Sequence, residues 1–407
     1  MTGLGAVSAF GFGVQALWKG LSEGQNGFRI ITEFETGDMA CKVGAAPPPF
    51  DPAEYVDRKM AVAMDVYEVM GLMAAREAMT DSGFPLRKEE SFRVAVFGGS
   101  AVGGKSTAWE EMLRFRDSDA YRVGVFAVPR IEIDMLAGWC AILLGIKGPN
   151  CGVNAACATG NYALAMGSAM IRMGQADAVL VVCADKPVMR LGFSAFGSMR
   201  ALARMDPEDP RNSLRIFDLH RSGTLFGDGA AALLLEPEEG AVRRGAKVYG
   251  EVAGVAMTDD AYHLAAPDPE GTSIVYAMRQ AIEGAGLAPS EIEYINAHGT
   301  GTPQNDVMET RGIKKVFGHH AYQVPVSSIK SMVGHQLGAA SATEAIASLL
   351  TIRDGIVPPT INLKTPDPEC DLDYVPNAPR RKSVRTVLSN SFGFGGHNAC
   401  VVFREYR

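Results

Sequence analysis

The chain has 407 residues, of which 47% are hydrophobic and 21% are charged, and its formal net charge is −7. This composition is that of a globular protein and excludes a disordered chain, and the acidic balance argues against a nucleic-acid-binding protein. The length suits two domains, or one large core made of two similar halves.

Short apolar strands alternate with amphipathic helices along the chain. The predicted strands are Arg93–Phe97, Ala178–Cys183, Ala231–Leu235, Glu293–Asn296, Val324–Ser328 and Cys400–Phe403. The predicted helices are Ala61–Ser82, Asn161–Met173, Thr272–Gly284 and Ala340–Arg353. Continuous apolar strands between helices indicate sheets covered on both faces, which is the α/β class. The acidic, Gly-rich stretch Glu236–Gly250 could join two halves, and we divide the chain into residues 1–240 and 241–407.

The segment Gly99–Ser106 matches G-x-x-x-x-G-K-[ST], the pattern of phosphate-binding P-loops. It follows a strand and precedes a plausible helix, and the strand that ends near Asp185 could supply a magnesium-binding carboxylate. A nucleotide-binding protein is therefore the alternative from another function class. We discount it because it leaves the Cys, His, Lys and Phe segments described next unexplained.

The segment VNAACATGNYALAMG places Cys157 on a tight turn of small residues, between a short strand and an amphipathic helix. A thiol at a helix N-terminus lies beside unpaired N–H groups and the positive end of the helix dipole, which favour an anion. We expect this position to lower the pKa of the thiol from about 8.5 towards neutrality and to make it a nucleophile. The structural alternative is a small buried hydrophobic side chain.

Three further segments place polar or aromatic residues directly after strands. INAHGTGTPQND presents His298 on a Gly/Thr loop, and VPVSSIKSMVGHQLGAASATE carries Lys330 and His335. Glu344 lies in the small-residue helix that follows and needs a partner there, because burying an unpaired charge is costly. In VLSNSFGFGGHN, Phe394 lies in a Gly-rich turn that permits close approach of a ligand. Each segment alone also has an ordinary structural explanation.

Together, CATG with Cys157, NAHGTGTP with His298, SSIKSMVGH with Lys330 and His335, and NSFGFGGHN with Phe394 resemble the elongating 3-oxoacyl-[acyl-carrier-protein] synthases of the thiolase-like superfamily. The order and rough separations match along almost the whole chain, and TGLGAVSAFG, GFSAFGSMRALA and FDLHRSGTLFGDGAAALLLE extend the similarity. The resemblance implies two similar halves in a five-layered α-β-α-β-α arrangement, with the nucleophile in residues 1–240 and both histidines and the lysine in residues 241–407.

The activity that the resemblance implies is a decarboxylative Claisen condensation. Cys157 would take an acyl group from the phosphopantetheine arm of an acyl carrier protein, and the enolate formed from malonyl-carrier protein would attack that thioester. His298 and His335 would be neutral N–H donors to the enolate oxygen, and the backbone N–H groups of Cys157 and Phe394 would form the oxyanion hole. Phe394 would also act as a gate. Apart from the carrier's arm, no cofactor and no metal is implied.

The resemblance also implies supporting roles around this centre. Lys330 would act electrostatically and would position His335 and Glu344. The other positions are Thr300 and Thr302 for contact with substrate or pantetheine, Asp306 as a brace of its loop, Val102 in the acyl pocket, and Arg58, Lys59 and Arg200 for docking the acidic carrier protein.

The resemblance implies a homodimer, or a heterodimer with a related subunit in a polyketide pathway. A non-catalytic, chain-length-setting partner lacks the nucleophile, so Cys157 argues against that alternative. A degradative thiolase would use a Cys/His/Cys arrangement, which fits less well than two histidines with Lys330. The acyl chain length, and the choice between fatty acid and polyketide synthesis, stay open.

Cysteine usage and the N-terminal segment indicate the cell compartment. The seven cysteines are scattered without C-x-x-C pairing, which argues against a disulfide framework or zinc site and favours a reducing cytoplasm. Lys19 is the first cation and follows the apolar opening stretch, the wrong order for a signal peptide. No apolar run approaches the about 18–20 residues that span a bilayer. We therefore expect a soluble protein that does not bind a membrane.

Overall fold

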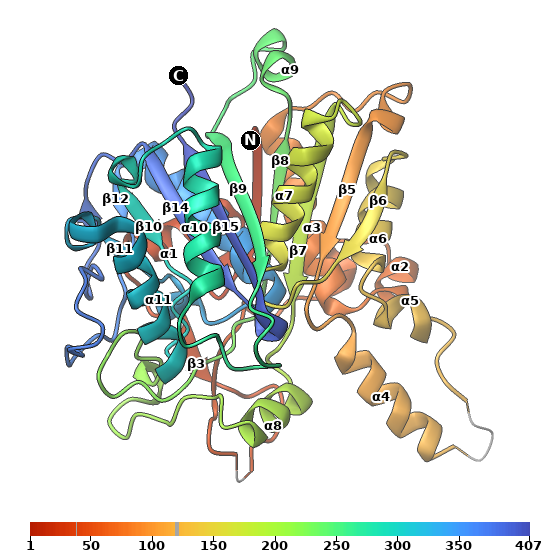
Figure 1. Ribbon diagram of the computed structural model, residues 1–407. Coiled ribbons are helices and arrows are strands. Elements are labelled where there is room, and N and C mark those ends of the chain that lie inside the picture. The colour runs from red at the N-terminus through yellow and green to blue at the C-terminus, as the bar shows by residue number, and fades with distance from the viewer. Residues whose placement is uncertain (38, 119–121) are drawn as a thin grey trace.

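The computed structural model describes residues 1–37, 39–118 and 122–407, and two sheets organise it (Figure 1). The first sheet has six strands, in the order β2 (Gly11–Phe12), β1 (Gly3–Ser8), β8 (Gly229–Leu235), β7 (Ala178–Asp185), β5 (Val94–Gly99) and β6 (Asn150–Val153). Strands β7, β5 and β6 run parallel, whereas β8 is antiparallel to both β7 and β1. Their buried, apolar sequences are those of a sheet covered on both faces.

The second sheet has five strands and belongs to the later part of the chain. Its order is β11 (Val326–Ser327), β10 (Tyr294–Asn296), β14 (Thr386–Phe392), β15 (His397–Arg404) and β9 (Glu251–Asp259). Strand β10 is parallel to β11 and β14, whereas β15 is antiparallel to both β14 and β9. Two small antiparallel sheets of two strands each are separate from these: β3 (Phe28–Ile30) with β4 (Val43–Ala45), and β12 (Ile356–Val357) with β13 (Arg380–Arg381).

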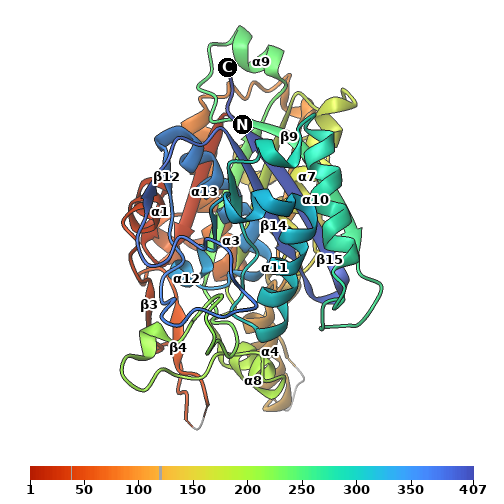
Figure 2. The same ribbon diagram turned by 60° about the vertical axis from the view of Figure 1, so that its left-hand side comes forward.

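Two helices lie between the sheets, and the other long helices cover the outer faces (Figures 1 and 2). The middle layer contains α7 (Thr159–Arg172) and α13 (Ala340–Asp354), and every residue of α13 up to Ile352 is buried, as expected of an interior helix. The first sheet is covered by α3 (Val66–Ser82) and α6 (Met135–Leu144), and the second by α10 (Thr272–Gly284), with α11 (Pro303–Phe317) beside it. The predicted five-layered α/β arrangement is confirmed.

The shorter helices lie around this framework. They are α1 (Val14–Ser22), α2 (Arg58–Ala63), α4 (Lys105–Arg116), α5 (Ala127–Ile131), α8 (Arg190–Ser198), α9 (Glu238–Arg243) and α12 (Lys330–Val333). Both chain ends lie near α9, at the end of the molecule away from α8 (Figure 1). Among the described residues, no helix combines the length and apolarity that crossing a bilayer requires.

The predicted strands and helices are present, with one helix divided. The single helix expected over Ala61–Ser82 is wrong, because the chain is extended at Met64 between α2 and α3. Asp65 begins α3 with a capping box: its side chain accepts a hydrogen bond from Tyr67 N, and the Glu68 side chain accepts one from Asp65 N. The D-x-x-E signal for this start is legible in the sequence.

Candidate active site

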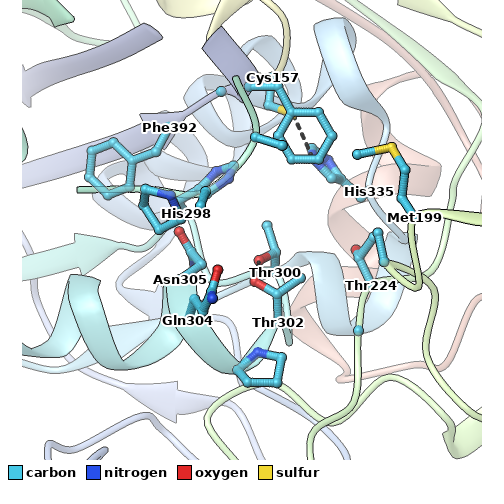
Figure 3. A pocket seen from close by; sticks show the side chains of 18 of the residues that line it. Cys157, Met199, Thr224, His298, Thr300, Thr302, Gln304, Asn305, His335 and Phe392 are labelled. Carbon is cyan, nitrogen blue, oxygen red and sulfur yellow. Dashed lines mark hydrogen bonds between the residues drawn. The ribbon is translucent and has the colours of Figure 1, made fainter. Parts of the chain in front are cut away.

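Cys157, His298 and His335 line one cavity of about 440 Å³ (Figure 3). Cys157 Sγ lies 3.0 Å from His335 Nε2, and the two imidazole rings are 5.7 Å apart, nearly perpendicular to each other. The thiol comes from the segment between the first sheet and α7, whereas both histidines follow strands of the second sheet. The fold therefore brings together the three side chains that the sequence singled out.

Cys157 lies on a strained turn just before α7, and Ala156 beside it has a positive φ of 49°. Burial raises the pKa of the Cys157 thiol to about 12, although the charge of Lys330 and the Phe394 N–H act in the opposite direction. The expectation that the helix N-terminus brings this pKa towards neutrality is therefore wrong. Loss of water around a thiolate outweighs the favourable charges and dipoles at this depth.

His335 is held as a neutral ring whose proton is on Nε2. Its backbone N donates to Leu225 O at 2.7 Å, and its carbonyl accepts from Gly227 N at 3.1 Å. The N–H of Leu337 donates to His335 Nδ1 at 3.3 Å, so Nδ1 is the unprotonated nitrogen. Burial, and then the charge of Lys330, hold the pKa of His335 well below 6.5. The ring therefore presents an N–H to the thiol.

His298 is also a neutral ring with its proton on Nε2, but different residues hold its backbone. Glu309 accepts hydrogen bonds from the backbone N of His298 and of Gly299, both at 2.8 Å. Lys330 Nζ donates to His298 O at 2.7 Å and lies 3.4 Å from Nδ1. Since the ammonium only donates, Nδ1 accepts and Nε2 carries the proton. Burial, Lys330 and His335 hold the pKa of His298 well below 6.5.

Lys330 and Glu344 form an ion pair in which each side chain is 1% exposed. Lys330 begins α12, and Glu344 lies in the interior helix α13. Burial raises the pKa of Glu344 to about 7, and the charge of Lys330 opposes that rise. The pair therefore satisfies the need for a partner that the sequence indicated, and it places a cation next to both histidines.

The loop after His298 is braced from inside. Thr300 and Thr302 line the cavity, and their hydroxyls lie 3.0 Å apart. Asp306 is fully buried and accepts hydrogen bonds from the backbone N of Phe217, Thr300 and Gly301 at 2.8, 3.2 and 3.1 Å. These contacts hold the backbone of the loop, and both threonine side chains face the cavity.

Phe394 lies at the cavity with its ring 37% exposed, stacked 5.8 Å from Phe196. Its turn approaches the nucleophile closely, because a Cβ on Gly393 would lie 3.1 Å from Cys157 N. Gly395 and Gly396 have φ near +85°, a conformation that L-residues rarely adopt. The turn between β14 and β15 therefore needs glycine both for its close approach and for its shape.

The remaining predicted residues are placed at different distances from the centre. Val102 is buried in the same apolar cluster as Cys157, but it is not among the residues that line the cavity. Arg200 is exposed and lines the cavity. Arg58 and Lys59 are exposed on the first turn of α2, and within the described residues neither lines the cavity.

The P-loop interpretation of Gly99–Ser106 is wrong, because an internal carboxylate occupies the loop. Asp185, at the end of β7, accepts hydrogen bonds from Ala101 N and Val102 N at 2.9 Å and from the Ser100 hydroxyl. The N–H groups that would bind a phosphate are therefore used inside the protein. Asp185 is fully buried and has no room for a magnesium ion between itself and these donors.

Several residues of the site have only a weak signal in the sequence, or none. Glu309 lies one helical turn after Asp306 in α11, and a carboxylate on the buried side of an amphipathic helix was the available clue. The cavity is also lined by side chains from irregular loops, which periodicity does not reveal: Ser222, Thr224, Asp260 and His263. Gln304 and Asn305 at the start of α11, and Asn398 in β15, line it as well.

Known proteins match this chain over its whole length. Residues 1–241 match the model of the beta-ketoacyl synthase N-terminal domain, and residues 249–364 match that of the C-terminal domain. A 3-oxoacyl-[acyl-carrier-protein] synthase 2 of Synechocystis sp. is 42% identical, with 100% of this chain and 98% of that protein covered. The protein of the same name from Coxiella burnetii is 40% identical, with 99% and 97% covered.

Solved structures agree with this assignment. The ishigamide ketosynthase/chain length factor superposes with a TM-score of 0.91 at 35% identity, covering 100% of this chain and 98% of that one. A type II PKS acyl-carrier protein in complex with its ketosynthase, bound to the hexaketide, gives a TM-score of 0.91 at 31% identity with the same coverage. With matching sequence and fold along the whole chain, and with the thiol and two imidazoles in one cavity, this chain belongs to the beta-ketoacyl synthase family.

Proposed function

We propose that the chain is a 3-oxoacyl-[acyl-carrier-protein] synthase, which extends an acyl chain by decarboxylative condensation with malonyl-acyl-carrier protein. The observation that carries this proposal is the placement of Cys157 Sγ 3.0 Å from His335 Nε2, in a cavity that His298 also lines. The identity of about 40% to 3-oxoacyl-[acyl-carrier-protein] synthases 2 supports the same activity.

The first stage loads the enzyme. The phosphopantetheine arm of the carrier brings an acyl thioester, and Cys157 Sγ forms a bond to its carbonyl carbon. The carbonyl oxygen takes up negative charge and accepts hydrogen bonds from the backbone N–H groups of Cys157 and Phe394. The bond to the carrier sulfur then breaks, and the carrier leaves as a thiol with the proton that Cys157 gives up. No cofactor beyond the carrier's arm takes part.

The second stage forms the carbon–carbon bond. Malonyl-carrier protein loses CO₂, and the electron pair of the broken bond passes into an enolate whose oxygen accepts the Nε2–H groups of His298 and His335. The enolate carbon attacks the Cys157 thioester, the carbon–sulfur bond breaks, and 3-oxoacyl-carrier protein is released. The thiolate then recovers a proton. Burial, reinforced by the charge of Lys330, keeps both imidazoles neutral, so they serve as donors throughout.

The residues around this centre serve binding. Phe394 acts as a gate whose ring leaves Phe196 to admit the malonyl substrate, and the positive-φ glycines that follow it permit the motion. Thr300 and Thr302 contact the pantetheine arm. The apolar cluster around Val102 opens to receive the acyl chain. Acidic carrier protein docks on exposed cations, and we assign that contact to Arg58, Lys59 and Arg200.

The chain works as a dimer in the cytoplasm. Its two halves, residues 1–240 and 241–407, carry the thiol and the imidazoles respectively. We assign the contact with a second subunit to edge strand β6 and to exposed apolar side chains of the helices near it in the sequence, α4, α5 and α6. The likeness to the ishigamide ketosynthase/chain length factor keeps a heterodimer as the second candidate. All seven cysteines are free thiols, which suits a reducing compartment.

Mass spectrometry of the intact protein tests this function. After incubation with acyl-carrier proteins of different chain lengths, the protein should gain one acyl group, located at Cys157 by peptide mapping. Addition of malonyl-carrier protein should then remove the acyl group and yield 3-oxoacyl-carrier protein with release of CO₂. The matched control is Cys157→Ala, which should take up no acyl group. Acylation at another cysteine, or none with any carrier, would refute the proposal.

A further inference from the structure

Asp185 is a buried carboxylate that the condensation mechanism does not use. It ends β7 and is 0% exposed, and four donors surround its two oxygens. Three donors belong to the loop after β5: the Ser100 hydroxyl, Ala101 N and Val102 N. The fourth is Gly338 N, at 2.6 Å from Oδ2. Asp185 therefore joins two loops that are far apart in the sequence.

The contact at Gly338 is too close to tolerate a side chain. A Cβ on Gly338 would lie 2.6 Å from Ala101 N and 2.7 Å from Asp185 Oδ2. Glycine at this position thus lets the backbone N–H reach the carboxylate. Because a buried N–H without an acceptor costs about 1–3 kcal/mol, loss of Asp185 would release Gly338 from this position.

The position of Gly338 bears directly on His335. Gln336 and Leu337 connect the two, and Leu337 has a positive φ of 47°, a backbone conformation that is unfavourable for a leucine. The N–H of Leu337 donates to His335 Nδ1, and this bond leaves the ring proton on Nε2, facing Cys157. The backbone of His335 is fixed on one side by residues 225–227, and Asp185 fixes the other side through Gly338.

The geometry points to Asp185 as a positioning residue that, through Gly338 and Leu337, keeps the proton of His335 on Nε2. Asp185 touches neither substrate nor thiol. Its effect is on the direction of one backbone N–H, which selects the histidine tautomer able to donate to the enolate. The kinetic part of this inference rests on the proposed function, whereas the tautomer is a property of the free protein.

The test compares Asp185→Ala with Asp185→Asn by ¹⁵N NMR of protein labelled with ¹⁵N-histidine. His335→Gln assigns the signals of His335. Wild type should show protonated Nε2 and unprotonated Nδ1, and Asp185→Ala should shift proton occupancy towards Nδ1. Asp185→Asn should keep the wild-type tautomer, because its carbonyl in the place of Oδ2 still accepts from Gly338 and Ala101. Its amide can donate to the Ser100 hydroxyl, and only the bond from Val102 N is lost. Condensation should fall about 10²-fold in the alanine variant, the loss typical of a misplaced catalytic group, and should be largely rescued in the asparagine variant.

Two further variants separate this role from general support of the fold. Ser100→Ala removes a donor from the same carboxylate but spares Gly338, and it should leave the His335 signals unchanged. Gly338→Ala breaks the contact from the other side and should reproduce the tautomer change, which decides the matter if Asp185→Ala does not fold. Unchanged His335 signals in the folded Asp185→Ala or in Gly338→Ala would overturn the inference. A tautomer change in a protein whose wild type shows no condensation would instead refute only the proposed function.

Discussion

At the scale of single residues, the site consists of charges and imidazoles that are almost entirely withdrawn from water. Burial lowers the pKa of His298 and His335 and raises that of Glu344; the charge of Lys330 adds to the first two shifts and opposes the third. In such surroundings one ammonium has far more effect than it would on a surface, because little solvent screens it. The imidazoles are neutral first because they are buried and then because of the charge of Lys330, which also pairs with the Glu344 carboxylate.

The ion pair of Lys330 and Glu344 predicts a specific pattern of stability. Lys330→Met leaves a buried carboxylate without its partner and should lower the free energy of unfolding by about 3–5 kcal/mol. The double variant Lys330→Met/Glu344→Gln removes both charges and should recover most of that loss. Urea unfolding followed by circular dichroism measures the two values. Equal loss in the single and the double variant would show that the charge pair is not the cause.

The depressed pKa of His298 predicts how stability depends on pH. The folded chain keeps this ring neutral, whereas the unfolded chain protonates it below about pH 6.5, so the unfolded state binds more protons and stability falls as the pH drops. Between pH 7.5 and 5.5 this ring should account for a loss of about 1.4 kcal/mol.

Replacement of two histidines checks this prediction by urea unfolding at both pH values. His298→Asn should lose about 1.4 kcal/mol less than wild type over this interval. The exposed His319 provides the control, and His319→Asn should follow the wild type. A pH dependence of His298→Asn identical to that of wild type would contradict the buried, neutral state of the ring.

At the scale of elements, β1 shows how a strand is fitted to its covering helix. Gly3 and Gly5 alternate along β1 on the side that faces α3, and a Cβ on Gly5 would lie 1.9 Å from Ala74 O. Helix α3 therefore packs on bare backbone at this point. The same helix is anchored at its start by the capping box of Asp65, so its position on the sheet is fixed at both places.

Substitution of Gly5 should therefore separate α3 from the sheet. Gly5→Ala should lower the free energy of unfolding by about 3 kcal/mol or more, since overpacking against rigid backbone is poorly relieved. The matched control is Gly240→Ala in α9, where no atom lies within 4 Å of the added Cβ. That change should stabilise the chain by about 0.5–1 kcal/mol. Thermal unfolding by calorimetry distinguishes the two, and similar midpoints would contradict the close packing of β1 on α3.

The sequence alone predicts the positions of the strongly periodic helices and strands. It does not predict how deeply the thiol of Cys157 is buried. Helices α7, α10 and α13 lie where their apolar patterns placed them. The pKa of Cys157 was misjudged because a helix N-terminus is a local feature, whereas burial depends on how two sheets close over it. The loops that supply His263 and Thr224 follow no period, so only tertiary structure reveals that they reach the cavity.

The apparent P-loop illustrates the same difference. Gly99–Ser106 has the residue pattern and the strand–loop–helix context of a phosphate-binding site, and both are local properties. The anion that the N–H groups of this loop bind comes from elsewhere in the chain: it is the carboxylate of Asp185, at the end of the neighbouring strand. A short motif specifies a cradle of N–H groups and does not specify whether a ligand or the protein itself supplies the anion.

At the scale of the whole molecule, the first sheet ends in a strand that pairs on one side only, among the residues that the structure describes. Edge strand β6 lies beside exposed apolar side chains, among which Val128 is 68% and Ile142 63% exposed. Surfaces of this kind usually mark an interface between subunits.

A charge beside this edge should therefore dissociate the proposed dimer. Ile142→Asp should shift the mass measured by light scattering from that of a dimer towards that of a monomer. Met173, which is also 63% exposed but lies at the end of α7, is the control, and Met173→Asp should remain dimeric. A wild type of monomeric mass, or a dimer that survives Ile142→Asp, would contradict this use of the edge.

The middle layer has a further consequence for the way in which the molecule opens. Helix α13 is shielded on both sides by sheets, so its amides should exchange with deuterium more slowly than those of α8 or the loop at residues 260–271, as mass spectrometry can measure. The thiol and both rings lie on turns that border this middle layer, not on α13 itself. We expect the layer beside them to exchange slowly, while the loops at the cavity rim move to admit each phosphopantetheine arm. Substrate can then enter and product can leave without disturbing the alignment of the reacting atoms.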